Sequence, residues 1–170
     1  MAKNIETYSI KLDMIDDIMR CYREVAPECL YQETAWQRTV CHPAKEFYIT
    51  AHQAYQRINL YLGGRTEAID SLKPLAAQRF RDLIKVVMRL AQMPEYQGKT
   101  LRALCKIAVK QPAPRFYIGT SAMKALFKNV VNGVFDDDGR NTNYMKARED
   151  PEFVRYSIEI ANKNKHKYVR

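Results

Sequence analysis

Seven Lys and Arg side chains in the second half of the sequence have the type and spacing needed to contact a polyanion. They are Lys99, Arg102, Lys106, Lys110, Arg115, Lys124 and Lys128. The first four follow one another at intervals of three, four and four residues, which places them along one face of a helix. Like charges at this spacing repel one another, and the phosphates of a nucleic acid would offset that cost. The spacing therefore predicts a nucleic-acid-binding face.

The aromatic neighbours of Arg115 suggest a second kind of contact. Arg115 precedes Phe116 and Tyr117, so the guanidinium could hold a phosphate while the Tyr117 ring stacks on a base. A competing interpretation makes Phe116 part of the core and Arg115 an ordinary surface residue, and for Phe116 we favour the core. We add Tyr117 to the seven cations as a candidate nucleic-acid-binding residue.

The positive charge of the chain is concentrated in its second half. The net charge of +9 comes from 28 basic and 19 acidic residues. Residues 1–85 hold 12 Lys/Arg against 11 Asp/Glu, a net charge of +1, whereas residues 86–170 hold 16 against 8, a net charge of +8. A field of one sign attracts polyanions, and among nucleic acids we favour DNA over RNA. A solvated face without a ligand and a contact with an acidic protein surface are the other interpretations.

A motif that occurs twice points to an internal duplication. The segment His42–Ile49 returns as Gln111–Ile118, an offset of 69 residues, and both copies fit the pattern P-A-x-x-F-Y-I. The same offset aligns several apolar positions before the motif. The sequence thus predicts a mainly α fold of two tandem units, residues 1–64 and 65–133. A polar loop, a C-terminal helix and a basic tail follow in 134–170, and we expect all three parts to form one compact domain.

Apolar spacing and helix-ending residues predict three helices in each unit. Their ranges are 12–25, 33–41 and a helix from 51 in the first unit, and 76–92, 100–110 and a helix from 121 or 122 in the second. Pro27 and Pro94 end the first helices, because the residue before proline avoids the helical region. Thr50 is a typical N-cap, and we expect Thr120 or Ser121 to cap the equivalent helix.

The connection between the second and third helices limits the mode of binding. Nine residues, 42–50, separate these helices in the first unit, whereas a helix-turn-helix motif uses about 3–4. The spacing therefore argues against standard major-groove insertion. Our hypothesis for the two Phe-Tyr-Ile segments, 47–49 and 116–118, is that they pair as a short antiparallel β ribbon.

The remaining residue patterns exclude most catalytic sites. His42, His52 and His166 have no partner at metal-ligand spacing, and Asp136–Gly139 lacks the alternating ligands of a calcium loop. Phosphate-binding glycine loops, nucleophile elbows and triads are also missing. We therefore expect a non-enzymatic protein without a metal or cofactor. The absence of C-x-x-C pairs, of a secretory signal and of a membrane-spanning segment favours the cytoplasm.

The second motif carries a resemblance to a known group of proteins. Pro112–Ile118 reads P-A-P-R-F-Y-I, and the small residues of Thr120–Ala125 follow it. This region resembles small basic, uncharacterised proteins of phages and mobile elements of gut bacteria, over about residues 102–131, with a weaker echo in 38–60. The first copy has Lys45-Glu46 where the second has Pro114-Arg115, so a role of the arginine applies to the second copy alone. The resemblance implies a phage or mobile-element origin.

Two functions fit these patterns. The first is a non-enzymatic protein that binds nucleic acid through the basic face of the second unit, in the host cytoplasm or in a virion. The alternative is a structural or assembly protein of a phage particle that contacts protein subunits, for which the 11 tyrosines and 7 methionines supply adhesive side chains. Neither interpretation involves a membrane.

Overall fold

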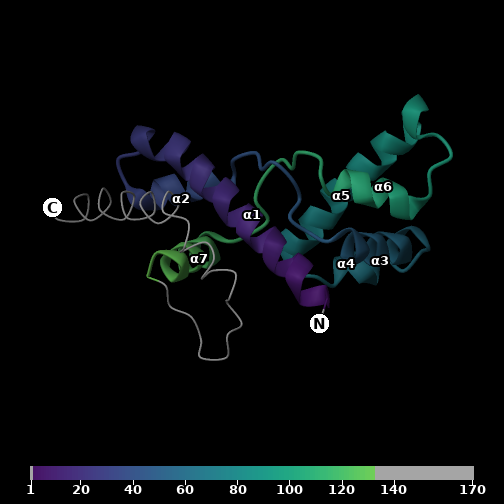
Figure 1. Cartoon of the computed structure of the whole chain (residues 1–170), viewed down its shortest axis with the longest axis horizontal. Coiled ribbons are helices and arrows are strands. Elements are labelled where there is room, and N and C mark those ends of the chain that lie inside the picture. The colour runs from purple at the N-terminus through teal and green to yellow at the C-terminus, as the bar shows by residue number, and fades with distance from the viewer. Residues whose placement is uncertain (1, 133–170) are drawn as a thin grey trace. The chain divides into compact units, whose positions relative to one another are not determined.

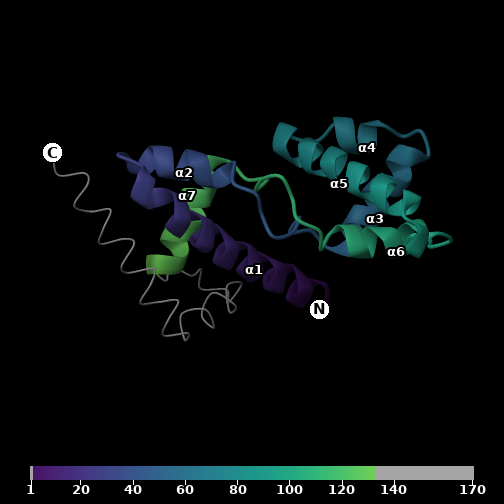
Figure 2. The ribbon, with the colours of Figure 1, turned by 90° about the horizontal axis from the view of Figure 1, so that it is seen from above.

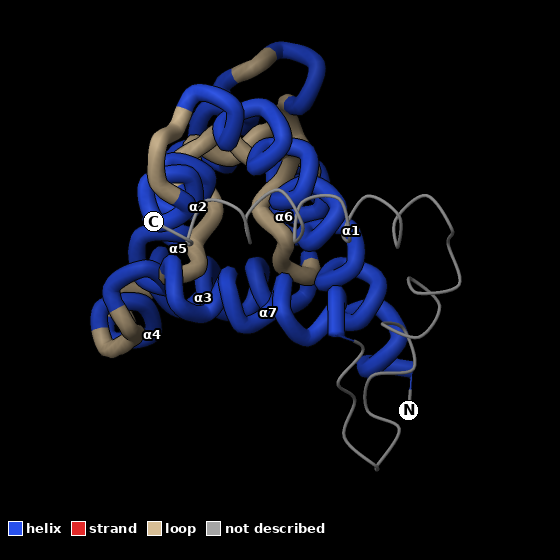
Figure 3. Tube along the Cα trace, turned by 90° about the vertical axis from the view of Figure 1, so that its left-hand side faces the viewer, coloured by secondary structure: helices blue, strands red, loops and turns tan. Residues whose placement is uncertain are grey.

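The fold was obtained as a computed structural model, which describes residues 2–132. This part of the chain consists of helices joined by loops and contains no strand (Figure 3). The predicted mainly α class is therefore confirmed. The predicted polar loop, C-terminal helix and basic tail lie outside the described residues.

The order of elements repeats along the chain (Figure 1). A long helix, a 3₁₀ helix and two further helices come first: α1 (Ala2–Val25), η1 (Ala26–Glu28), α2 (Gln32–Val40) and α3 (Ala51–Leu62). The short α4 (Glu67–Asp70) follows, and then the same order returns: α5 (Pro74–Gln92), η2 (Pro94–Tyr96), α6 (Leu101–Ala108) and α7 (Thr120–Asn132). The predicted helices agree closely with these bounds, except that α1 begins ten residues before the predicted start and α4 was not predicted.

Local signals explain where most helices begin and end. The Thr50 side chain accepts a hydrogen bond from the Gln53 backbone N–H at 3.1 Å, which confirms the predicted cap of α3. Gly64, with a φ of +94°, takes the left-handed conformation that ends this helix cheaply. The predicted cap of α7 is wrong: the helix begins at Thr120 itself, and Gly119 precedes it.

Two compact units divide the chain at points that differ from the predicted repeats. Unit 1 comprises the start of α1, up to Ile10, and residues 41–117. Of the described residues, unit 2 comprises 11–40 and 118–132. Unit 1 therefore packs α3, from the first predicted repeat, with α5 and α6 from the second (Figure 2). Unit 2 packs α2 from the first repeat with α7 from the second.

Aliphatic side chains dominate the core of unit 1. Ile58 of α3, Leu83 and Val87 of α5 and Leu104 of α6 are buried where these three helices meet. Each such side chain gains about 1.5–3 kcal/mol from leaving water. Cys105 lies in the same core, where burial raises the pKa of its thiol to about 11. Burial of apolar side chains therefore holds the helices of unit 1 together.

Three aromatic rings from different helices form a cluster in unit 2. The Trp36 ring of α2 lies 4.2 Å from the Tyr22 ring of α1 and 5.2 Å from the Phe127 ring of α7, measured between centroids. Trp36 and Tyr22 are only 1% exposed. Tilted and edge-on aromatic pairs add about 0.5–1.5 kcal/mol each beyond their area. Trp36 thus contacts rings from both α1 and α7.

The two P-A-x-x-F-Y-I segments meet inside unit 1, but not as the predicted ribbon. Ala44 and Ala113 form an isolated antiparallel bridge with two 3.0 Å hydrogen bonds, one in each direction. The Phe47 ring stacks on Tyr117, and Tyr48 stacks on Phe116, at 6.0 and 6.2 Å between centroids. No strand forms around this bridge in the described residues, so the ribbon is not confirmed.

Candidate nucleic-acid interface

Four cations lie along the solvent side of α6 and the turns that flank it. Lys99, Arg102, Lys106 and Lys110 are all exposed, and we call these four residues the α6 cationic face. Leu104, Cys105 and Ala108 are buried on the other side of the helix. Because those residues pack against α3 and α5, the amphipathic pattern of α6 fixes which side meets water. The face is therefore set by the fold of unit 1.

The members of this face differ in their contacts. The Arg102 guanidinium lies over the Tyr55 ring of α3, 4.8 Å from its centroid, which is a cation–π contact. Lys110 forms a 2.8 Å ion pair with Glu46. Within residues 2–132, Lys99 and Lys106 have no ion pair with any described carboxylate. Two lysines are thus available to an external anion, and one arginine is held in place by an aromatic ring.

Arg115 and Tyr117 are engaged within unit 1. The Arg115 Nε donates to the Phe116 carbonyl oxygen at 3.2 Å, and its side chain is half-buried. The Tyr117 hydroxyl donates to Asp82 Oδ2 at 2.9 Å, while its ring stacks on Phe47. Burial first, and then this hydrogen bond, raise the pKa of Tyr117 above its ordinary range. The expected core position of Phe116 is confirmed, since the residue is 1% exposed.

The other two predicted cations belong to unit 2. Lys124 and Lys128 lie on α7, and Lys124 forms an ion pair with Glu33 of α2. Lys128 is exposed. The seven predicted cations are therefore divided, five in unit 1 and two in unit 2.

Charge is distributed between the units even more unevenly than along the sequence. Residues 41–117 contain 13 Lys/Arg and 5 Asp/Glu, a net charge of +8. Residues 11–40 and 118–132 together contain 6 Lys/Arg and 6 Asp/Glu, a net charge of zero. Nearly all of the chain's excess of +9 thus belongs to residues 41–117 of unit 1.

Sequence reasoning missed two arginines that line a pocket of unit 1, Arg57 of α3 and Arg79 of α5. A signal for Arg79 was present, because it lies three residues after Ala76 and four before Leu83, within the apolar stripe of α5. A charged residue at such a position is either paired or functional.

The described residues contain neither a metal-binding cluster nor a membrane-spanning helix. No group of three or more His, Cys, Asp or Glu side chains there is arranged to hold a metal ion. None of the described helices combines the length and apolar character that crossing a membrane requires.

Comparisons with known proteins provide no relative from which a function could be inferred. A scan against protein-family models finds no match, and neither do searches among curated proteins and among solved structures.

Proposed function

We propose that the chain is a non-enzymatic nucleic-acid-binding protein, and that unit 1 binds the phosphate backbone, with duplex DNA as the preferred polymer. The single observation that carries the proposal is the net charge of +8 on residues 41–117 beside a net charge of zero on the described part of unit 2. A patch of one sign raises the rate of encounter with a polyanion. Release of condensed counterions then supplies the binding free energy.

The α6 cationic face is the proposed contact surface. Lys99 and Lys106 are exposed and unpaired with the described carboxylates, so they meet phosphates without first breaking an ion pair. Arg102 keeps its guanidinium over Tyr55, which reduces the conformational entropy lost on binding. Lys110 has to leave Glu46, whose side chain is only 15% exposed, so its contact with a phosphate costs more than those of Lys99 and Lys106.

The proposed contact surface contains fewer residues than the sequence predicted. Lys124 and Lys128 belong to unit 2, whose described residues have a net charge of zero, and Lys124 already has Glu33 as a partner. The Tyr117 ring and hydroxyl are both engaged by unit 1 itself. We therefore restrict the proposed contacts to the four residues of the α6 cationic face, with Arg115 at their margin.

We also infer that the chain consists of tandem three-helix units that arose by duplication, as part of a protein of phage or mobile-element origin. The two copies of the motif, offset by 69 positions, make reciprocal contacts: Phe47 with Tyr117, and Tyr48 with Phe116. If the inference is right, Phe47→Leu and Phe116→Leu lower the free energy of unfolding by similar amounts in denaturant titrations. A large loss at one position with none at the other would count against it.

Fluorescence anisotropy with labelled duplex DNA, single-stranded DNA and RNA tests the binding proposal. Affinity should fall steeply as salt rises from ~50 to ~200 mM, and the log–log slope should lose about 0.9 for each contact removed. The Lys99→Gln/Lys106→Gln variant removes two contacts, while Lys128→Gln on α7 removes an exposed charge outside the surface. The proposal fails if no polymer binds at ~50 mM salt, or if Lys128→Gln reduces the slope as much per charge as the double variant.

A second candidate, a structural or assembly protein of a phage particle, is favoured by one feature of unit 2. Leu30 and Tyr31, between η1 and α2, are 84% and 70% exposed. Adjacent large apolar side chains in water are typical of protein contacts. Co-sedimentation with particles that is indifferent to salt and nuclease, and is lost in Leu30→Ser/Tyr31→Ser, would favour this function over nucleic-acid binding.

A further inference from the structure

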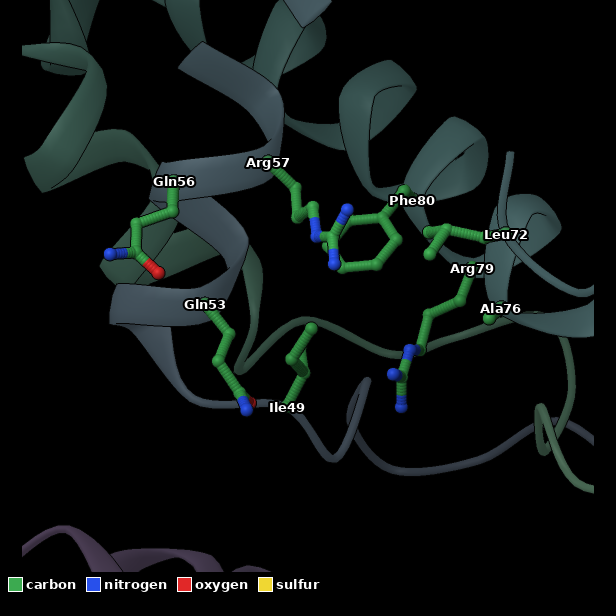
Figure 4. Close-up of a pocket in the computed structure, with 8 residues that line it drawn as sticks. All are labelled: Ile49, Gln53, Gln56, Arg57, Leu72, Ala76, Arg79 and Phe80. Atoms are coloured by element: carbon green, nitrogen blue, oxygen red, sulfur yellow. The ribbon is translucent and has the colours of Figure 1, made fainter. Parts of the chain in front are cut away.

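A pocket of about 350 Å³ lies in unit 1 between α3 and α5 (Figure 4). Its polar lining consists of two guanidinium groups, Arg57 and Arg79, and two carboxamides, Gln53 and Gln56. The rest of the lining is apolar, and none of the eight lining residues carries a carboxylate. A pocket with two positive charges and no lining carboxylate is suited to an anion.

Arg79 gives the strongest evidence that this pocket binds an anion. Its Nε is buried, and no polar atom of the described chain accepts a hydrogen bond from it. The guanidinium lies 5.7 Å from the centroid of the Phe80 ring, so apolar surface covers part of it. Burial lowers the pKa of Arg79, and no carboxylate compensates. A buried N–H without an acceptor costs free energy that a bound anion would offset.

Arg57 is held in place before any ligand arrives. Its Nη1 donates to the Ala68 carbonyl oxygen of α4 at 2.8 Å. The close-up shows its side chain extending from α3 into the space in front of α5, while Arg79 enters from α5 (Figure 4). Two guanidinium forks that line one pocket from different helices match the several oxygens of a phosphate better than a single halide ion.

The size and the remaining lining indicate what the anion is attached to. A volume of about 350 Å³ lies within the roughly 300–1,000 Å³ range of small-molecule sites, and is larger than an inorganic anion needs. Leu72 and Phe80 supply apolar surface, and a glutamine amide can pair with the edge of a purine base. We propose that the pocket binds the phosphate group of a nucleotide, with Arg79 and Arg57 on the phosphate and Gln53 and Gln56 on the base.

The phosphate can come from a free nucleotide or from the end of a nucleic-acid strand. The proposal does not rest on binding along α6, because none of the α6 cationic face lines the pocket. Loss of the α6 contacts should therefore leave nucleotide binding unchanged. The Lys99→Gln/Lys106→Gln variant separates the two proposals.

Nuclear magnetic resonance of the full chain, labelled with ¹⁵N, tests the pocket directly. The probes are adenosine 5′-monophosphate, inorganic phosphate, and one short oligonucleotide with either a 5′-phosphate or a 5′-hydroxyl. We expect the Arg79 Nε–H signal to shift saturably with adenosine 5′-monophosphate, and less with inorganic phosphate. Preference for the 5′-phosphorylated strand over the free nucleotide would assign the ligand to strand ends, and the opposite preference to free nucleotides.

Matched variants complete the test. Arg79→Gln should weaken nucleotide binding at least about tenfold, because it removes charge-assisted hydrogen bonds. Arg89→Gln makes the same change at an exposed position of the same helix and should have no effect. Circular dichroism checks that each variant folds, and Arg57→Gln replaces Arg79→Gln if the latter does not. The proposal is overturned if no probe shifts Arg79 saturably, or if Arg89→Gln weakens binding as much as the pocket variant.

Discussion

The two compact units carry different charges, although both have cores of aliphatic and aromatic side chains. Unit 1 buries aliphatic side chains such as Leu83 and Leu104 and has a net charge of +8 over residues 41–117. Unit 2 buries the ring cluster of Tyr22 and Trp36 with Phe127, and its described residues have a net charge of zero. Unit 1 therefore has an excess of positive charge, whereas the described part of unit 2 has equal numbers of basic and acidic residues.

The balance in unit 2 is visible in its ion pairs. Arg20 pairs with Asp17 and Glu24, and Arg38 pairs with Glu28. Arg20 lies between its two partners at three- and four-residue spacing on one helix. In unit 1, by contrast, 13 basic residues outnumber 5 acidic ones, so most cations there have no carboxylate to meet. This difference is the reason why the proposed function assigns binding to unit 1.

The largest expected effect comes from the core of unit 2. Trp36→Ala removes the ring that contacts both Tyr22 and Phe127, and it should lower the free energy of unfolding by about 3–5 kcal/mol. Denaturant titration followed by circular dichroism measures the loss. Leu30→Ala, at an exposed position of the same unit, should stay within about 0.5 kcal/mol. A loss for Trp36→Ala below 1 kcal/mol would show that the ring cluster is not the core.

Leu83→Ala makes the corresponding change in unit 1. The side chain is fully buried between helices, so we expect a loss of about 2–5 kcal/mol. Unlike Trp36→Ala, this variant should also weaken DNA binding, because α6 packs on α5. Anisotropy at a fixed salt concentration compares the two. Equal loss of affinity in both variants would contradict the division of roles.

Tyr117→Phe tests the hydrogen bond to Asp82 and should cost about 1 kcal/mol, since Asp82 keeps Lys85 as a partner. The pKa of Tyr117 is raised above its ordinary value of 10.0, so the folded protein retains the phenolic proton where the unfolded chain loses it. Its stabilising effect is therefore complete below about pH 10 and declines as the pH rises further.

The pH dependence provides the check on Tyr117. Between about pH 9 and 11 the free energy of unfolding should fall more steeply for the natural chain than for Tyr117→Phe, which cannot ionise. Thermal unfolding across this range measures both slopes. Parallel slopes would mean that Tyr117 ionises as easily in the folded protein as in the unfolded one.

The smallest effect is expected at the ion pair between Lys110 and Glu46. Glu46→Gln should cost less than about 1 kcal/mol of stability, because Lys110 is largely exposed. It also removes one negative charge next to the α6 cationic face, so DNA affinity should rise and its salt dependence should steepen. Glu95→Gln removes the same charge from an exposed residue of η2. A larger gain from Glu95→Gln than from Glu46→Gln would place the binding surface elsewhere.

The helices could be predicted from the sequence because their signals are local. Pro27 and Pro94 mark the ends of α1 and α5 to within two residues, and Thr50 caps α3 through its own side chain. Amphipathic spacing likewise gave the exposed and buried sides of α6. α4 escaped prediction because a helix of four residues has no periodicity to detect.

The exchange of helices between the predicted repeats could not be foreseen. Both repeats offer similar apolar stripes, so nothing local decides whether α3 packs on α2 or on α6. The same ambiguity affected the prediction of the binding surface. Lys124 and Lys128 were grouped with the cations of α6, but they belong to unit 2. Tyr48, with a φ of 50°, adopts a conformation uncommon for a residue of its type, and the sequence gives no sign of it.

Backbone amide shift mapping with a short DNA duplex at ~50 mM salt tests the division of roles most directly. The account predicts that shifts concentrate in residues 99–110 of unit 1, disappear as salt is raised, and leave residues 11–40 of unit 2 unchanged. Shifts centred on residues 11–40, or a complete absence of shifts, would contradict it.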